Sequence, residues 1–110
     1  MSRDVISELR IRRIDLERIS TPARFRMYDL TVCIVEITRA NYPDVEGSKP
    51  IYFVSLFFKY GNLRTRVFTI PCFDTFDFID KLKKEILNFK KTLYILGEKE
   101  AKHVFQGSPL

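Results

Sequence analysis

The stretch IYFVSLFFKYGNLRTRVFTIP, residues 51–71, decides the fold. Residues 51–60 are rich in β-branched and aromatic side chains, which is typical of a strand. Gly61-Asn62 predicts a two-residue hairpin turn, because glycine accepts the positive φ of a type II′ turn. Residues 63–70 then return as the partner strand, and Pro71 ends that strand because proline cannot donate to the ladder.

The hairpin register sorts the side chains onto two faces, because successive residues of a strand point to opposite sides. With Gly61-Asn62 as the loop, one face is apolar with threonines: Tyr60 opposite Leu63, Phe58 opposite Thr65, Leu56 opposite Val67, Val54 opposite Thr69. The other face combines cations with phenylalanines: Lys59 opposite Arg64, Phe57 opposite Arg66, Ser55 opposite Phe68, Phe53 opposite Ile70. The first face can pack under a helix. The second face would expose aromatic rings to solvent, which is unusual and calls for a functional explanation.

A helix follows this hairpin. Asp74 is placed to cap it, with Asp77 three residues later as in a capping box. Apolar residues then recur at helical spacing, at Phe78, Ile79, Leu82, Ile86, Phe89 and Leu93. Lysines fall mostly on the opposite side and are interpreted as ordinary helix surface. The pattern predicts an amphipathic helix over 75–91 that packs on the sheet.

A third strand, residues 28–39, precedes the hairpin, and the turn-forming residues 40–50 read as a linker. An antiparallel meander is the simplest pairing. We expect an α+β fold, an antiparallel sheet of three to five strands with a C-terminal amphipathic helix on one face. Residues 1–110 are one domain, with its core at 28–91.

The two ends are less regular. Residues 3–9 read as a short helix and residues 10–19 as a strand with a bulge. Residues 92–96 read as a short strand or the last turns of the helix, which Gly97 stops.

Charge favours an anionic partner. The net charge is +5 over 110 residues, and all ten arginines lie at or before Arg66. The first ten residues are charged where a signal peptide is apolar, and no apolar run is long enough to span a membrane. These features predict a soluble, cytoplasmic protein. Cys33 and Cys72 form no CxxC pair, so we expect two buried thiols rather than a disulfide or zinc site.

Single-stranded nucleic acid explains the basic-aromatic face best. Bases stack on aromatic rings while Lys and Arg follow the phosphates. The predicted contacts are Phe53 and Phe57 for bases, and Lys59, Arg64 and Arg66 for phosphates. A second basic group supplies further predicted contacts at Arg12 and Arg13, with Arg24 and Arg26 beyond them if residues 10–19 lie beside the sheet.

Two alternatives remain open for the same residues. The phenylalanines could be buried under the N-terminal segment or in a homodimer, with the cations as a solvated rim. The face could instead dock a protein partner, for which an exposed hairpin or sheet edge would suit strand addition. A regulator of duplex DNA is a third class, although no helix-turn-helix spacing is present.

Catalytic and metal-binding patterns are absent from the sequence. His103 is the only histidine, so neither a serine triad nor a histidine-based metal site can be assembled. No glycine-rich phosphate loop occurs. We therefore expect a protein that is not an enzyme and that uses no metal or cofactor.

The order of strand, GN turn, basic-aromatic strand RTRVFTIP and helix FDFIDKLKKEIL resembles sheet-plus-helix modules that bind single strands. Pur-type repeats, Whirly proteins and positive-cofactor-type coactivators share this layout, and it is similar to the crenarchaeal ThermoDBP proteins. The resemblance covers residues 28–91 and rests on layout and residue character. It implies a binding sheet that includes Phe57, Lys59, Arg64 and Arg66, a dimeric or paired assembly, and an archaeal or viral origin.

Overall fold

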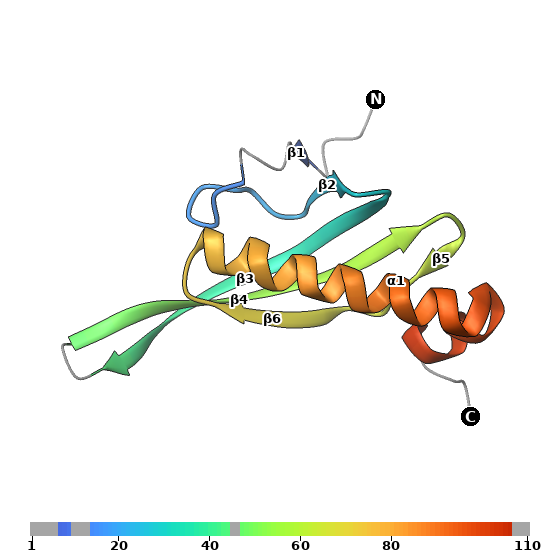
Figure 1. The fold of residues 1–110 in the computed structure, drawn as a ribbon. Coiled ribbons are helices and arrows are strands. Elements are labelled where there is room, and N and C mark those ends of the chain that lie inside the picture. The colour runs from blue at the N-terminus through green and yellow to red at the C-terminus, as the bar shows by residue number, and fades with distance from the viewer. Residues whose placement is uncertain (1–6, 10–13, 45–46, 107–110) are drawn as a thin grey trace.

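The computed structural model describes residues 7–9, 14–44 and 47–106 and shows an antiparallel sheet curled as a half-barrel around one long helix (Figure 1). The elements are β1 (Ser7–Leu9), β2 (Ala23–Met27), β3 (Leu30–Asp44), β4 (Gly47–Tyr60), β5 (Leu63–Arg64), β6 (Phe68–Cys72) and α1 (Thr75–Gln106). The expected α+β class is confirmed.

The sheet order is β1-β2-β3-β4, after which β5 and β6 both pair with β4. All of these pairs are antiparallel except β1 with β2, which run parallel. The predicted antiparallel pairing of residues 28–39 with residues 51–60 corresponds to β3 and β4. β4 is therefore a central strand, and it carries the basic-aromatic face that the sequence predicts.

The core lies between the sheet and α1. The even-numbered residues of β4 point toward the helix, and Val54, Leu56 and Phe58 are fully buried. From the helix, the predicted apolar stripe meets them with Phe78, Leu82, Ile86 and Phe89, all buried. This assignment of one sheet face to the helix leaves the odd-numbered residues of β4 on the outer side.

Both ends of the predicted helix behave as local chemistry dictates. The Asp74 carboxylate accepts a hydrogen bond from the Asp77 amide at 2.7 Å, and the Phe73 amide donates to the Asp77 carboxylate at 2.9 Å. Gly97 interrupts the helix with φ 79°, a conformation that favours glycine. Residues 92–96 are helical, and helical residues resume after the break up to Gln106.

Residues 40–50 were expected to be a linker, and this is wrong. Residues 40–44 extend β3 and residues 47–50 extend β4, and together they form a protruding two-stranded ribbon with Asn41 opposite Pro50 and Pro43 opposite Ser48 (Figure 1). A ribbon of two strands has two open edges, where an outward-facing backbone position needs no N–H partner. Proline is tolerated at such positions, so the two prolines do not end the strands.

The N-terminal expectations are also wrong where the structure describes them. Residues 7–9 form a strand rather than part of a helix, and residues 14–20 form a turn rather than a strand. The turn closes on Asp15, whose carbonyl accepts from the amides of Arg18 and Ile19, while its carboxylate accepts from Glu17. Ile14 and Leu16 are thereby buried against the core.

The hairpin register changes by one residue after β5. Lys59 lies opposite Arg64 as predicted, but Leu56 lies opposite Phe68 and Val54 opposite Ile70. Residues 65–67 supply the extra residue. The cause is visible at Thr65, whose hydroxyl accepts from the Phe58 amide at 3.0 Å while its own amide donates to the Phe58 carbonyl. A side chain thus occupies a ladder position that a backbone carbonyl would normally fill.

Candidate nucleic-acid interface

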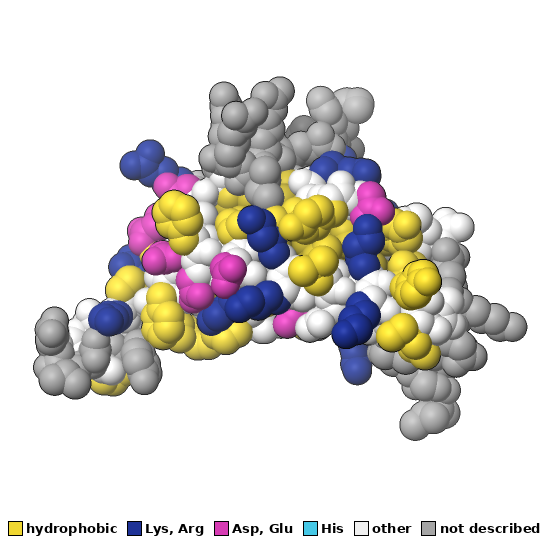
Figure 2. Space-filling view, in the orientation of Figure 1, with side chains coloured by type: hydrophobic (Ala, Val, Ile, Leu, Met, Phe, Trp, Pro, Cys, Tyr) yellow, Lys and Arg dark blue, Asp and Glu magenta, His cyan; other side chains and the backbone are white. Residues whose placement is uncertain are grey.

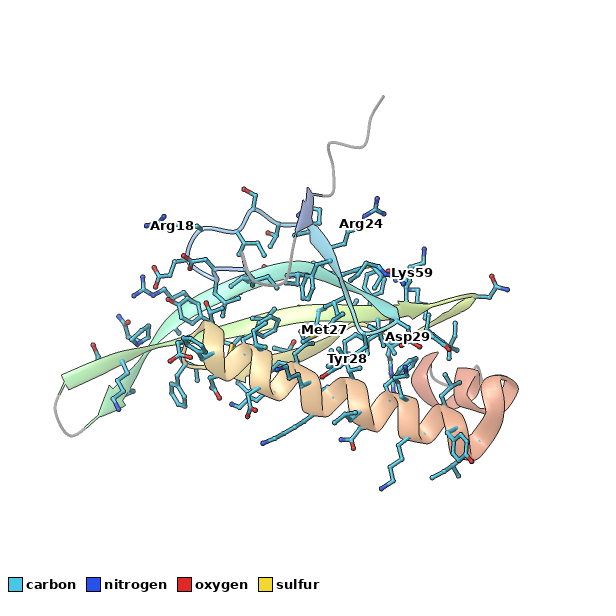
Figure 3. The ribbon with its side chains drawn as sticks, turned by 45° about the horizontal axis from the view of Figure 1, so that its top comes forward. Arg18, Arg24, Met27, Tyr28, Asp29 and Lys59 are labelled. Carbon is cyan, nitrogen blue, oxygen red and sulfur yellow. The ribbon has the colours of Figure 1, made fainter. Side chains whose placement is uncertain are left out.

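The face of the sheet that points away from α1 carries a basic group, which we call the outer face. Its position follows from the register, because Arg26 lies opposite Thr31, Thr31 opposite Lys59, and Lys59 opposite Arg64. Four neighbouring strands therefore contribute to a single row across the sheet. Arg24 and Lys59 point away from the helix side (Figure 3).

An arginine and a phenylalanine form a stacked pair at one end of this row. The Arg64 guanidinium carbon lies 4.2 Å from the centre of the Phe57 ring. This is a close cation–π contact, and it covers one face of the phenyl ring with a flat, charged group. Phe57 is half-buried and Arg64 is exposed. The pair therefore exposes a planar cation to solvent, and an apolar ring lies directly beneath this cation.

Several cations away from the outer face form ion pairs. Lys81 pairs with Asp77 and Lys84 with Asp80 along α1. Two more pairs, Lys90 with Asp29 and Arg39 with Glu17, link different elements.

Among the described residues, Arg26, Lys59 and Arg64 have no acidic partner within ion-pair distance. The register places two acidic residues on this face away from that row: Glu36 lies opposite Ser55, farther along β4, and Glu8 lies beside Arg24 at the β1–β2 edge. The outer face is thus positively charged near the β4–β5 turn.

The face that carries α1 has a mixed surface. There, lysines and exposed hydrophobic side chains alternate with acidic ones (Figure 2). The ion pairs along the helix agree with the interpretation of its lysines as ordinary surface.

The outer face becomes apolar toward the ribbon. Phe53 is 37% exposed and lies between Thr38 of β3 and Pro71 of β6. Ser55 and Thr69 separate it from the basic end, joined to each other by a 3.0 Å hydrogen bond between their hydroxyl groups. One continuous surface therefore runs from an exposed phenyl ring to the Arg64–Phe57 pair.

The structure brings four of the predicted site residues together and separates the others. Phe53, Phe57, Lys59 and Arg64 share the outer face. Arg66 does not lie opposite Phe57 as predicted, because it falls in the 65–67 bulge at the border of the sheet and α1. For the same reason Phe68 faces the core, where its ring lies 5.3 Å from that of Phe58. Arg12 and Arg13 lie outside the described residues.

Strand β2 was not predicted, and it adds Arg24 and Arg26 to the outer face. Its sequence ARFRM alternates apolar and basic residues, with Ala23, Phe25 and Met27 buried. That period of two was the available signal. Both arginines belong to the basic group predicted from the sequence, but that prediction depends on a strand at 10–19, which the described part of that segment does not form.

Cys33 lies in the middle of this face, opposite Phe57 and Arg24. Burial raises the pKa of the Cys33 thiol, while the positive charges of Lys59, Arg24 and Arg64 act in the opposite direction. Burial likewise raises the pKa of the Cys72 thiol to about 11. Both thiols are free, as expected. No cluster of metal-ligating side chains occurs within the described ranges.

Comparisons with known proteins add no assignment. No family model, curated protein or solved structure matches the chain. No helix in the described part of the chain is long and apolar enough to cross a membrane.

Proposed function

We propose that the protein binds single-stranded nucleic acid, DNA or RNA, on the outer face and acts without catalysis. The observation that carries the proposal is the row of Arg26, Lys59 and Arg64 beside Phe57, which has no acidic partners in the described residues. Cations without partners are available for phosphates, and a supported planar group is available for bases.

The Arg64–Phe57 pair gives a specific binding mode. The guanidinium already lies on the phenyl ring, so an incoming base would stack on the guanidinium plane or displace it from the ring. Either arrangement uses a flat surface that is independent of base identity. Binding at this end of the face should therefore depend weakly on sequence.

The rival function, capture of a protein by strand addition, has less support at β6. Pro71 lies within this five-residue strand and lacks the N–H that an added strand would need. Its carbonyl already accepts a hydrogen bond from the Lys81 ammonium at 2.7 Å. A homodimer that covers Phe53 stays part of the proposal, because it would leave the basic end of the face open.

The test is the salt dependence of binding to a labelled single strand. For single strands the slope of log affinity against log salt is about −0.7 per phosphate neutralised, so three cations predict a slope of about −2.1. Affinity would then fall about 20-fold between about 50 and about 200 mM salt. In the double variant Lys59→Gln/Arg64→Gln the slope should fall to about −0.7.

The matched control removes the same charge from the helix. Lys83 and Lys91 are exposed and have no ion-pair partner among the described residues. The variant Lys83→Gln/Lys91→Gln should keep the wild-type slope. Equal losses in the two double variants would show that net charge, and not the outer face, drives binding.

A further inference from the structure

A pocket of about 260 Å³ opens between α1 and the 65–67 bulge. It lies at the border of the sheet, beside the point where β5 ends. It is lined by three phenylalanines, Phe58, Phe68 and Phe89, by the buried Thr65, and by the exposed polar residues Arg66, Glu85 and Asn88. All three residues of the bulge, 65–67, line this pocket, so it lies where the ladder between β5 and β6 is interrupted.

Three phenyl rings form the floor of the pocket. Phe58 and Phe68 meet edge to face at 5.3 Å between ring centres, and Phe58 and Phe89 do so at 5.7 Å. Phe58 and Phe89 are almost completely buried, whereas Phe68 is only partly covered. The rings therefore form an apolar wall in which Phe68 has the surface that a flat aromatic ligand could contact, and Phe58 packs against it.

The mouth of the pocket carries hydrogen-bonding groups of different kinds. Asn88 can both donate and accept, and the Glu85 carboxylate can only accept. Arg66 supplies a positive charge at the outer rim, and no acidic partner for it occurs in the described residues. An apolar floor with a polar edge and a cation beyond it corresponds to a base, its pairing edge and a phosphate.

We propose that this pocket takes one nucleobase of the bound single strand, turned out of the stack. The proposal rests on the proposed function for its ligand, but it concerns a different site. A cavity of about 150 Å³ already holds benzene, so about 260 Å³ gives room for one pyrimidine or purine ring. Turned-out bases are held by stacking on apolar side chains and by hydrogen bonds to their pairing edge.

The chain connects the two sites. Arg64 lies on the outer face, and Arg66, two residues later, lines the pocket. Two extended residues span at most about 7 Å, which is close to the spacing of successive extended nucleotides. A strand whose phosphate contacts Arg64 can therefore continue to Arg66 within about one nucleotide and place its next base in the pocket.

The rim also predicts which bases fit. Glu85 accepts hydrogen bonds only, so it favours a pairing edge with an amino group. Guanine, adenine and cytosine carry such a group, whereas thymine and uracil do not. The pocket should thus add a base preference to an otherwise sequence-tolerant interface.

The experiment compares two tryptophan variants on the exposed side of α1. Asn88→Trp places an indole ring in the pocket, while Leu87→Trp makes the same kind of change at an exposed neighbour that does not line it. Labelled strands of thymidine with a single central guanosine, and strands of thymidine alone, are titrated with each variant. The wild type should bind the guanosine strand about ten- to hundredfold more tightly, the range expected for a hydrogen bond from the base to the charged Glu85 carboxylate.

In Asn88→Trp this preference should disappear while the salt slope stays, and Leu87→Trp should behave as wild type. Glu85→Gln should reduce the difference in affinity between the guanosine strand and the thymidine strand, because a Gln side chain can also donate a hydrogen bond to thymine. A preference that survives Asn88→Trp, or is absent in the wild type, overturns the pocket and leaves the proposed function intact.

A second titration with guanosine monophosphate separates the two proposals completely. Amide shifts that cluster at residues 65–67 and 88–92, without any binding of longer strands, would keep the pocket and refute the outer face. Absence of shifts together with absence of strand binding would refute both.

Discussion

Substitution of Thr65 by Val should destabilise the protein more than a hydroxyl-to-methyl change normally does. Thr65 is 5% exposed, and its hydroxyl is the acceptor for the Phe58 amide at 3.0 Å. Valine has nearly the same shape but no acceptor, so a buried N–H loses its partner. Such a loss costs about 1–3 kcal/mol. For a domain of this size the melting temperature should fall by about 5–20 °C.

The assay is thermal and urea unfolding of the variant beside Thr69→Val. Thr69 is an exposed threonine of the adjacent strand, and its hydroxyl bonds only to Ser55 at the surface. The control should change stability by less than about 0.5 kcal/mol. Hydrogen exchange at the Phe58 amide should accelerate in the Thr65 variant alone. Equal stability of the two variants would refute the assignment of the bulge to the Thr65 hydroxyl.

Two further outcomes concern the helix and its link to the β2–β3 turn. Asp74→Ala removes the cap of α1 and should cost about 1 kcal/mol in urea unfolding, with no change in the denaturant slope. Asp29 accepts a hydrogen bond from Lys90, which lowers the pKa of its carboxyl below 3.8. Its contribution is therefore present above pH 3.8 and lost as the pH falls through the lower folded value. The stability difference between wild type and Asp29→Asn, measured by urea unfolding, should shrink in acid and be constant near neutrality.

The sequence predicts those parts of the fold that depend on local chemistry. Gly61 and Asn62 locate the hairpin turn, so the pairing of Lys59 with Arg64 is predicted correctly. Asp74 and the apolar stripe from Phe78 locate the helix and its buried face. In each case neighbouring residues determine the structure, and a pattern of one residue type is enough to detect it.

The errors arise where a residue that is distant in the sequence determines the local structure. The register slips after Arg64 because the Thr65 hydroxyl replaces a backbone acceptor for a residue seven positions away. Nothing in the sequence marks this threonine among the others. Pro43 and Pro50 read as loop residues, but pairing along the ribbon places them within strands.

The predicted positions of the candidate site residues are correct for some residues and wrong for others, for the same two reasons. Phe57, Lys59 and Arg64 share the outer face because the turn fixes them, and Phe53 shares it because it has the same parity on β4. Arg66 lies beyond the slip and moves to the pocket. The contribution of β2 required knowledge that residues 23–27 pair with β3, which depends on contacts across the sheet.

Fluorescence anisotropy of the wild-type protein with a labelled 20-mer single strand, at low and moderate salt and with duplex as competitor, tests the central claim most directly. We predict micromolar or tighter binding at low salt, about 20-fold weaker at about 200 mM than at about 50 mM, and poor competition by duplex. Absence of binding at low salt, or equal competition by duplex, would contradict the claim that the outer face recognises single strands.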